Sequence, residues 1–309
     1  MEIADIPEGH RSGFVAIAGR PNVGKSTLIN AFLGQPVAAV SPRPQTTRHR
    51  QLGILTLPTT QAIFIDTPGI HKPRHKLGEQ MNANALEVLE DADLLLVMFD
   101  LSRFPNEDDQ RVADGIKALN PSPPTLVVLN KIDLVPPDEL INRQAAFKTL
   151  LPDIEMYAIS STRGDNRDQL LQHILKQLPS GPRYYPEEEV TDTYQRDIAA
   201  DLIRAAGLKL LRDEVPHCIA IRIDEYKERN QQGAYIAATL FVERESQKGI
   251  VIGKGGSMLR KIGTIARQDI EAMSGRKVYL ELRVKVLSGW RNDERALKRM
   301  GFSGTGRYH

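Results

Sequence analysis

Residues 19–26 decide the fold and read Gly19-Arg20-Pro21-Asn22-Val23-Gly24-Lys25-Ser26. The stretch matches the phosphate-binding pattern G-x-x-x-x-G-K-[ST], and it lies between an apolar run at 14–18 and a helical pattern at 25–33. In that setting the glycines let backbone N–H groups converge on a phosphate at the N-terminus of a helix. We expect Lys25 to contact the β- and γ-phosphates and the Ser26 hydroxyl to be a ligand of Mg²⁺. The loop therefore predicts a nucleotide site.

The first 180 residues alternate short apolar runs with longer helical patterns. The candidate strands are 14–18, 52–57, 62–65, 94–99, 125–129 and 156–159. The candidate helices are about 25–33, 80–91, 107–119, 137–150 and 166–178. Near-continuous apolar strands are typical of a mostly parallel sheet that helices cover on both faces. The pattern predicts a three-layer α/β domain over residues 1–180.

The remainder of the chain predicts a second, smaller domain. Pro179-Ser180-Gly181-Pro182 interrupts the helical pattern at about 179–190, and we assign residues 181–191 as the linker between the two domains. Beyond it we expect a helix at 192–212, strands at 217–226 and 234–243, helices at 255–262 and 263–273, and a strand at 277–287. This α-β-β-α-α-β order predicts a small α+β domain with an antiparallel or mixed sheet over residues 192–309, with a short C-terminal tail.

The composition is that of an ordinary globular protein with an uneven charge distribution. The 309 residues carry 41 Lys plus Arg and 39 Asp plus Glu, for a formal charge of +2, but residues 246–309 hold 14 basic and 5 acidic side chains. That surplus favours a polyanion partner as much as it favours a solvated basic face. Cys218 is the single cysteine, which excludes an intramolecular disulfide and a cysteine-rich metal site. The run at 94–99 is too short to span a bilayer and residues 1–13 do not resemble a leader, so we expect a cytoplasmic protein.

Three further motifs follow later strands. Asp66-Thr67-Pro68-Gly69 offers a carboxylate that can hold Mg²⁺ through water and a Gly69 amide that can sense a γ-phosphate. In Asn130-Lys131-Ile132-Asp133, the Asp133 carboxylate can accept two N–H bonds from guanine, whereas adenine would leave it poorly paired. Backbone N–H groups of Ser160-Ser161 can reach the guanine carbonyl. Each motif alone could be a simple turn, but at the carboxyl ends of successive strands they jointly predict a GTP site.

The segments that follow the first helix and the second motif read as switch loops. Ser41-Pro42-Arg43-Pro44-Gln45-Thr46-Thr47-Arg48 is polar and proline-rich, as expected of a loop that orders on Mg²⁺ and γ-phosphate. Ile70 follows Gly69 where many GTPases carry a water-positioning Gln, so a Gln-based mechanism is excluded at that position. In His71-Lys72-Pro73-Arg74-His75-Lys76 we favour a partner-contacting loop over a catalytic histidine.

A second signal lies near the C-terminus. Gly253-Lys254-Gly255-Gly256 fits the G-x-x-G loop with which KH domains clamp a single-stranded nucleic-acid backbone. It is flanked by the apolar run 250–252 and by Arg260-Lys261-Ile262-Gly263. We expect the apolar residues to be partly core and partly the floor of a four-nucleotide groove; a plain turn between core elements is the alternative. For Trp290, packing is favoured over stacking on a base.

The GTP motifs resemble the Ras-like translation-factor class of GTPases, although Ser160-Ser161-Thr162 departs from the usual Ser-Ala. Together with the second domain, which resembles a type II KH fold, they resemble the Era family over nearly the whole chain. The resemblance implies a P-loop GTPase domain, hydrolysis of GTP with Mg²⁺, and action in assembly of the small ribosomal subunit. It also implies binding near the 3′ end of 16S rRNA, cytoplasmic residence with peripheral association with the inner membrane, and a monomer.

The resemblance also implies which residues form each site. Lys25, Thr47, Asp66, Gly69 and Asn22 would be catalytic, with Ser26, Thr47 and Asp66 (through water) around Mg²⁺ and Thr46 as a less favoured alternative to Thr47. Pro21-Asn22 resembles the loop of potassium-activated GTPases, so Asn22 is a hypothetical K⁺ ligand against a purely structural turn residue. The GTP-binding set is Gly19, Arg20, Pro21, Asn22, Val23, Gly24, Lys25, Ser26, Thr27, Asp66, Thr67, Pro68, Gly69, Asn130, Lys131, Asp133, Ser160 and Ser161. The RNA-binding set is Lys248, Ile250, Ile252, Gly253, Lys254, Gly255, Gly256, Arg260 and Lys261.

Two other classes of function stay open at this point. One is an RNA-binding scaffold in which GTP is only a slow timer or a cell-cycle or stress checkpoint signal. The other is a kinase or ATPase that shares only the phosphate loop, against which the Asn130–Asp133 motif argues.

Overall fold

The structure is a computed structural model that describes residues 9–40, 47–48, 50–73, 75–191, 195–229, 233–300 and 302. The chain forms two compact units, and their main division follows Asp192. Each unit has its own hydrophobic core.

One six-stranded sheet organises the first unit, with the strand order β2-β3-β1-β4-β5-β6. Its strands are β1 (Arg11–Ala18), β2 (Gln51–Leu57), β3 (Thr60–Asp66), β4 (Leu94–Asp100), β5 (Thr125–Asn130) and β6 (Met156–Ile159). Neighbouring strands are parallel except for the antiparallel pair of β2 and β3. All six predicted strands are therefore present, and the mostly parallel sheet is confirmed.

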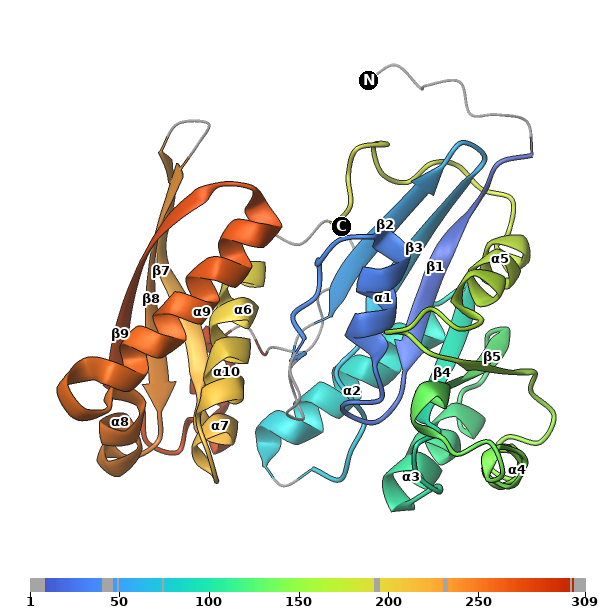
Figure 1. Cartoon of the computed structure of the whole chain (residues 1–309), viewed down its shortest axis with the longest axis horizontal. Helices are drawn as coiled ribbons and strands as arrows, with labels where there is room; N and C mark the ends of the chain where they lie inside the picture. The colour runs from blue at the N-terminus through green and yellow to red at the C-terminus, as the bar shows by residue number, and fades with distance from the viewer. Residues whose placement is uncertain are drawn as a thin grey trace. The chain divides into compact units, whose positions relative to one another are not determined.

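Helices cover both faces of this sheet, as Figure 1 shows. They are α1 (Lys25–Leu33), α2 (Lys76–Glu90), α3 (Glu107–Lys117), α4 (Leu140–Lys148) and α5 (Arg167–Gln177). Apolar side chains of α1 and α5 pack with Val15 and Ile17 of β1. Those of α2, α3 and α4 pack with Ala16 and Ala18, which alternate to the opposite face of the same strand. The predicted three-layer α/β architecture is confirmed.

The register of the sheet gathers the sequence motifs at one edge. Ile17 of β1 pairs with Asp66 at the end of β3, and Asp100 at the end of β4 pairs with Asn130 at the end of β5. The phosphate loop leaves β1 one residue beyond Ile17 and enters α1. Carboxyl ends of adjacent parallel strands meet at the same edge, which is where open α/β sheets bind ligands.

The proline-rich segment after α5 lies along the first unit. Gln61, fully buried in β3, fastens it: its Oε1 accepts from the Tyr184 N–H (2.8 Å) and the Tyr185 N–H (3.0 Å), and its Nε2 donates to the Tyr185 carbonyl (2.9 Å). Farther along, the Ile54 N–H of β2 donates to the Val190 carbonyl at 2.8 Å. The segment predicted as a linker is therefore bonded to the sheet up to Val190.

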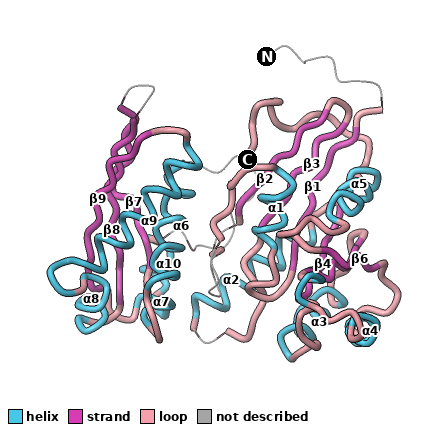
Figure 2. Tube along the Cα trace, in the orientation of Figure 1, coloured by secondary structure: helices cyan, strands magenta, loops and turns pink. Residues whose placement is uncertain are grey.

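The second unit is a three-stranded mixed sheet with helices. Its strands are β7 (Ala220–Arg229), β8 (Gly233–Val242) and β9 (Lys277–Val286), with β8 antiparallel to β7 and parallel to β9. The longer helices are α6 (Gln195–Leu210), α8 (Glu245–Ile252) and α9 (Ser257–Ser274), which Figure 2 shows in cyan beside the magenta strands. Ile236, Ala238 and Leu240 point from β8 into a core shared with Ile203 of α6 and Ile262 of α9. The α+β class and the mixed sheet are confirmed.

Two assignments in the second unit were wrong. The expected helices at 255–262 and 263–273 are one helix, α9, and the other helix of this pair is α8, which precedes the glycine loop. Gly263 lies inside α9 and does not end it, and a Cβ there would make only an ordinary contact of 3.5 Å with Leu282 Cδ1 of β9. The strand expected to begin at 217 begins at Ala220, because Val215–Cys218 form the short helix α7 with Pro216 in its first turn.

The region predicted as a short tail contains further elements. A 3₁₀ turn at Trp290–Asn292 is followed by α10 (Glu294–Arg299). Two other 3₁₀ turns lie at Ile132–Leu134 and Lys254–Gly256. In the described part of the chain, no helix combines the length and apolar character that crossing a membrane requires.

Candidate functional site

The phosphate loop has the backbone geometry that its sequence predicts. Gly24 has φ 109°, and a Cβ there would lie 2.2 Å from Asn130 Nδ2, so only glycine fits between α1 and the base motif. Lys25 is buried, and its Nζ donates to the carbonyl oxygens of Gly19 and Arg20, each at 3.1 Å. Burial lowers the pKa of Lys25 to about 8, with the Asp66 carboxylate acting in the opposite direction. The lysine is thus held inside the loop that would surround a phosphate.

Three oxygen-bearing side chains predicted as Mg²⁺ ligands converge beside this loop. Asp66 Oδ2 accepts from Ser26 Oγ at 2.6 Å and from Thr47 Oγ1 at 3.0 Å, and the two hydroxyl oxygens lie 3.2 Å apart. Asp66 Oδ1 is buried with no hydrogen-bond partner among the described residues. Burial raises the pKa of Asp66 despite opposing effects of Lys25, Ser26 and Thr47. Hard oxygen ligands around a buried carboxylate that lacks a full set of partners fit a Mg²⁺ ion. Thr46 lies outside the described residues.

Asn130 connects the base motif to the phosphate loop. Its Nδ2 donates to the Val23 carbonyl (2.7 Å), while its Oδ1 accepts from both the N–H and the hydroxyl of Ser161 (2.9 Å each). Asp133 Oδ1 is buried without a hydrogen-bond partner in the described structure, as expected of a carboxylate that receives N–H groups from a base. The N–H groups of Ser160 and Ser161 both donate within the protein, to the Asp165 carbonyl and to Asn130, so their predicted donation to guanine stays a prediction.

The second switch segment approaches the phosphate loop closely. A Cβ on Gly69 would lie 2.5 Å from the Pro21 nitrogen, and the Ile70 N–H donates to the Gly19 carbonyl at 3.1 Å. Ile70 is buried in the core of the first unit. His71 folds back, with Nδ1 2.8 Å from the Gly69 carbonyl oxygen, and Asn82 of α2 donates to its carbonyl at 2.7 Å. Arg74 of the predicted basic run lies outside the described residues.

Two carboxylates at this edge were missed by the sequence analysis. Asp100 accepts from Lys131 Nζ at 2.7 Å, and Asp109 of α3 accepts from Arg20 Nε at 2.9 Å. Asp100 could have been found, because it ends an apolar strand as Asp66 does. The pairing of Asp109 with the phosphate loop carries no local sequence signal, because 89 residues separate the partners. Asn22 is exposed, with φ 64°.

The glycine loop of the second unit connects α8 to α9. Gly253, Gly255 and Gly256 have φ values of 72°, 59° and 77°, which favour glycine. A Cβ at Gly255 would meet no atom within 4 Å, so the loop backbone is open on that side. Arg260 Nη2 donates to the Gly255 carbonyl at 2.7 Å and braces the loop from the first turns of α9.

Several cations and an exposed apolar side chain lie in this loop and on the two helices that it connects. Lys254, Arg260 and Lys261 are exposed, and Lys248 lies 3.5 Å from Glu245 one turn earlier on α8. Ile250 is 51% exposed. Val251 and Ile262 are fully buried and belong to the core, whereas the floor of a nucleotide groove stays a prediction. Cations and apolar surface beside an open glycine loop suit a single-stranded nucleic-acid backbone with its bases.

Trp290 packs in the core of the second unit. It is fully buried, and its Nε1 donates to the Cys218 carbonyl at 2.9 Å. The packing interpretation is confirmed, and the base-stacking alternative was wrong.

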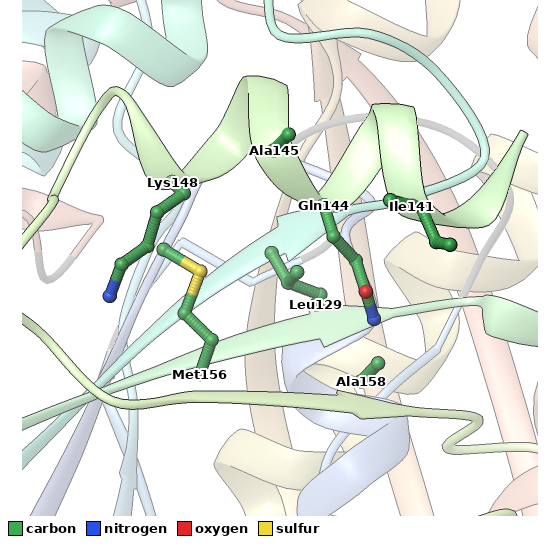
Figure 3. Close-up of a pocket in the computed structure, with 7 residues that line it drawn as sticks. All are labelled: Leu129, Ile141, Gln144, Ala145, Lys148, Met156 and Ala158. Atoms are coloured by element: carbon green, nitrogen blue, oxygen red, sulfur yellow. The ribbon is translucent and has the colours of Figure 1, made fainter.

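A separate cavity of about 360 Å³ lies between α4 and the strands β5 and β6. Figure 3 shows Leu129, Met156 and Ala158 beneath Ile141, Gln144, Ala145 and Lys148 of the helix. Lys148 Nζ donates to the Ile154 carbonyl at 2.9 Å, and the rest of the lining is mostly apolar. Among the described residues that line it, the cavity therefore offers one lysine, already hydrogen-bonded to a carbonyl, and no glycine loop of the kind that surrounds a phosphate.

Comparisons with known proteins match both units. A family model described as "50S ribosome-binding GTPase" matches residues 14–131, and a KH domain model matches residues 214–291. The chain is 45% identical over 294 residues to GTPase Era of Geobacter metallireducens, covering 95% of this chain and 98% of that protein. It is 44% identical over 292 residues to GTPase Era of Heliobacterium modesticaldum, covering 94% and 97%.

Solved structures are similar over the same span. A crystal structure of Era in complex with MgGDPNP and nucleotides 1506–1542 of 16S ribosomal RNA superimposes with a TM-score of 0.89 at 40% identity, covering 95% of this chain and 99% of that one. An Aquifex aeolicus Era variant bound to GDP·AlF₄⁻ gives a TM-score of 0.88 at 39% identity with the same coverage. Because these relatives are similar along nearly the whole of both chains, and family models for the GTPase and the KH domain match the two units, the chain belongs to the Era family of GTPases.

Proposed function

We propose that this GTPase is a switch that binds RNA near the 3′ end of 16S rRNA and acts in assembly of the 30S ribosomal subunit. The observation that carries the proposal is the presence, in one chain, of a GTP site and of an open glycine loop with exposed cations in it and on α9. The similar Era structure with MgGDPNP and nucleotides 1506–1542 of 16S ribosomal RNA supports the choice of RNA.

For hydrolysis, Ser26, Thr47 and Asp66 would hold Mg²⁺, whose charge offsets the negative charge of the β- and γ-phosphates. Lys25 leaves the loop carbonyls to contact phosphate oxygens, because their negative charge pairs with the ammonium better than neutral carbonyls do. The Gly69 amide binds the γ-phosphate beside Pro21. Ile70 offers no polar group to orient water, so these charges and the loop amides carry the catalysis.

We further propose that K⁺ binds at the exposed Asn22 and stabilises charge in the transition state. GTP turnover should then be faster in potassium than in sodium buffer, and Asn22→Ala should remove the difference. Equal turnover of the unaltered chain in the two buffers would contradict the role.

Binding of GTP and RNA should be coupled. GTP would order Thr47 and Gly69, and the ordered state would bind RNA more tightly. By thermodynamic reciprocity, RNA should increase the affinity for a GTP analogue by the same factor by which the analogue increases the affinity for RNA. The test measures RNA affinity with GDP or a GTP analogue bound, and single-turnover GTP hydrolysis with and without a 16S 3′-end oligonucleotide. Crosslinking identifies the nucleotides touched.

Two substitutions of exposed lysines in the second unit test whether the glycine loop carries the effect of RNA on hydrolysis. Lys254→Glu, in the glycine loop, should abolish the effect of RNA on hydrolysis, whereas Lys277→Glu, at the start of β9, should preserve it. An RNA that changes neither GTP affinity nor turnover would contradict coupling and favour a scaffold in which GTP is a slow timer or checkpoint signal. ATP should fail to compete with GTP, since adenine cannot satisfy Asp133.

The proposal includes a cytoplasmic monomer with some peripheral association with the inner membrane. The surplus of nine positive charges over residues 246–309 (14 basic, 5 acidic) would attract an anionic lipid surface. Co-sedimentation with anionic vesicles but not with neutral ones would support direct association, and equal sedimentation with both would contradict it.

A further inference from the structure

A network of charged side chains lies behind the phosphate loop, on the side of α3. Arg20 Nε is 2.9 Å from Asp109 Oδ1, and Arg20 Nη2 is 3.6 Å from Asp100 Oδ2. The Asp109 side chain is fully buried and that of Arg20 is only 12% exposed. Separating the two partners of such a pair would leave a buried charge uncompensated, which is energetically costly. The pair therefore holds the phosphate loop, through Arg20, in one position beside α3.

Asp109 is itself held in place by the start of α3. Its Oδ2 accepts from the Asn106 N–H at 3.1 Å, and the Asn106 side chain caps the helix by accepting from the Asp109 N–H at 3.1 Å. This reciprocal capping box leaves Oδ1 directed at Arg20. Arg20 is thus attached to a fixed point of the fold and not to another loop.

The network extends from Arg20 to both halves of the nucleotide site. The Arg20 carbonyl accepts from Lys25 Nζ at 3.1 Å, which connects the network to the phosphate-binding lysine. Asp100 Oδ2 also accepts from Lys131 Nζ at 2.7 Å, and the same ammonium donates to the Asn22 carbonyl at 2.9 Å. The Asp100 carboxylate therefore faces Arg20 of the phosphate loop and Lys131 of the base motif at the same time.

We propose that Arg20, Asp109 and Asp100 are positioning residues that lock the phosphate loop to α3 and to the base motif, and that this lock slows nucleotide release. The side chains act through the loop, since that of Arg20 is directed at the carboxylates of α3 and β4. Affinity for GDP and for GTP depends on the lock, because both nucleotides need the same arrangement of loop amides. The proposal rests on the guanine-nucleotide site of the proposed function but not on its RNA partner.

The test is the dissociation rate of fluorescent GDP from the full chain, measured by stopped flow without RNA. Arg20→Gln and Asp109→Asn should each accelerate release about tenfold, the size expected within one ion-pair network. The double variant R20Q/D109N should release GDP within about twofold of either single variant, because both remove the same interaction. Arg20→Lys should be intermediate, since a single ammonium can pair with Asp109 but cannot also span to Asp100.

Two variants of the same helix separate positioning from loss of stability. Asn106→Ala removes the side-chain half of the α3 cap but keeps the Asn106 N–H that donates to Asp109 Oδ2, so it should lower Tm without accelerating release. Arg111→Gln breaks the exposed pair of Arg111 and Asp108 (2.6 Å) and should change neither Tm nor release.

Wild-type release rates in both R20Q and D109N would overturn the proposal, as would effects that multiply in the double variant. Acceleration by N106A equal to that by D109N would show that α3 stability, and not the lock, governs release. If R20Q does not fold, the release rates of D109N and R20K serve as the test instead, and wild-type rates in both would overturn the proposal. A wild-type chain that failed to bind GDP would refute the nucleotide site itself, whereas a failed RNA effect alone leaves this test intact.

Discussion

At the scale of single residues, Asp133 is the predicted determinant of the base that the site accepts. One of its oxygens is buried without a partner in the described structure, and guanine offers two N–H groups to such a carboxylate. Xanthine presents an oxygen where guanine has its amino group, and an Asn amide pairs with that oxygen and with the neighbouring ring N–H. Asp133→Asn should therefore weaken GTP binding by about 100-fold or more and make XTP the preferred nucleotide, measured by competition against fluorescent GDP and XDP.

Asp138→Asn is the matched control for this change. Asp138 is an exposed carboxylate five residues farther along the same loop, and its substitution should leave the preference for GTP unaltered. If D133N still preferred GTP over XTP, the base would be recognised by other groups than the Asp133 carboxylate.

At the scale of elements, the sequence predicted the first unit more accurately than the second. The six strands and the phosphate loop carry strong local signals: apolar runs, and glycines where the backbone requires them. In the second unit the sequence analysis assigns the apolar run at 250–252 to no helix or strand, yet it forms the last turn of α8 (Glu245–Ile252). The order of the main elements was right, but the bounds of the two helices around the glycine loop and the start of the first strand were wrong.

Contacts between distant segments account for what the sequence could not predict. Three of the four hydrogen bonds of Gln61 fasten the segment after α5, and their partners lie more than 100 positions away in the sequence. The fourth bond, to Thr56, joins the two strands of one hairpin. Likewise, the pairing of Arg20 with Asp109 follows from the packing of α3 beside the loop and not from either local sequence. Ligand-binding motifs could be predicted, but the side chains that hold them in position could not.

The connection between the end of β8 and the turn at 290–292 should make the second unit sensitive to acid. Glu243 Oε2 accepts from Arg291 Nη2 at 2.5 Å, with both side chains less than one fifth exposed. Burial acts to raise the pKa of Glu243, but the hydrogen bond and charge of Arg291 outweigh it and hold the pKa below its ordinary value of 4.5. A carboxyl whose pKa is lower in the folded state stabilises the fold above the unfolded pKa and loses this effect as pH falls through the folded pKa.

Glu243→Gln should accordingly lower the free energy of unfolding by about 1–2 kcal/mol at pH 7, the difference between a charged and a neutral hydrogen bond. The difference in the free energy of unfolding between variant and wild type should become smaller below about pH 4.5. Urea titration followed by the fluorescence of Trp290, the single tryptophan, reports on this unit. Asp224 also has a lowered pKa and contributes to acid sensitivity in both proteins. The exposed Glu245→Gln should match wild type at every pH, and a constant E243Q gap from pH 7 to pH 4 would contradict the assignment.

At the scale of the whole molecule, the formal charge of +2 hides two regions for which different polyanions are proposed, with residues 186–245 (8 basic and 13 acidic side chains) between them. Residues 1–185 hold 19 basic and 21 acidic side chains, and the cation nearest the predicted phosphates is the buried Lys25. Residues 246–309 hold 14 basic and 5 acidic side chains, and the basic side chains near the glycine loop are mostly exposed. Salt screens exposed charges far more than buried ones. The two binding activities should therefore respond differently to ionic strength.

RNA binding should weaken steeply with salt while GTP binding stays nearly constant. If Lys248, Lys254, Arg260 and Lys261 each neutralise one phosphate, the logarithm of RNA affinity should fall against the logarithm of salt with a slope of about −3, at roughly −0.7 per contact on a single strand. GTP affinity with excess Mg²⁺ should change less than about threefold over the same range, since its contacts are buried. Fluorescence anisotropy with a 16S 3′-end oligonucleotide measures the slope, which Lys261→Gln should make shallower by about 0.7 and Lys277→Gln should leave unchanged. A slope near zero would mean that the basic surface does not contact the RNA backbone, and an equal loss in K277Q would mean that net charge, and not the glycine loop, attracts it.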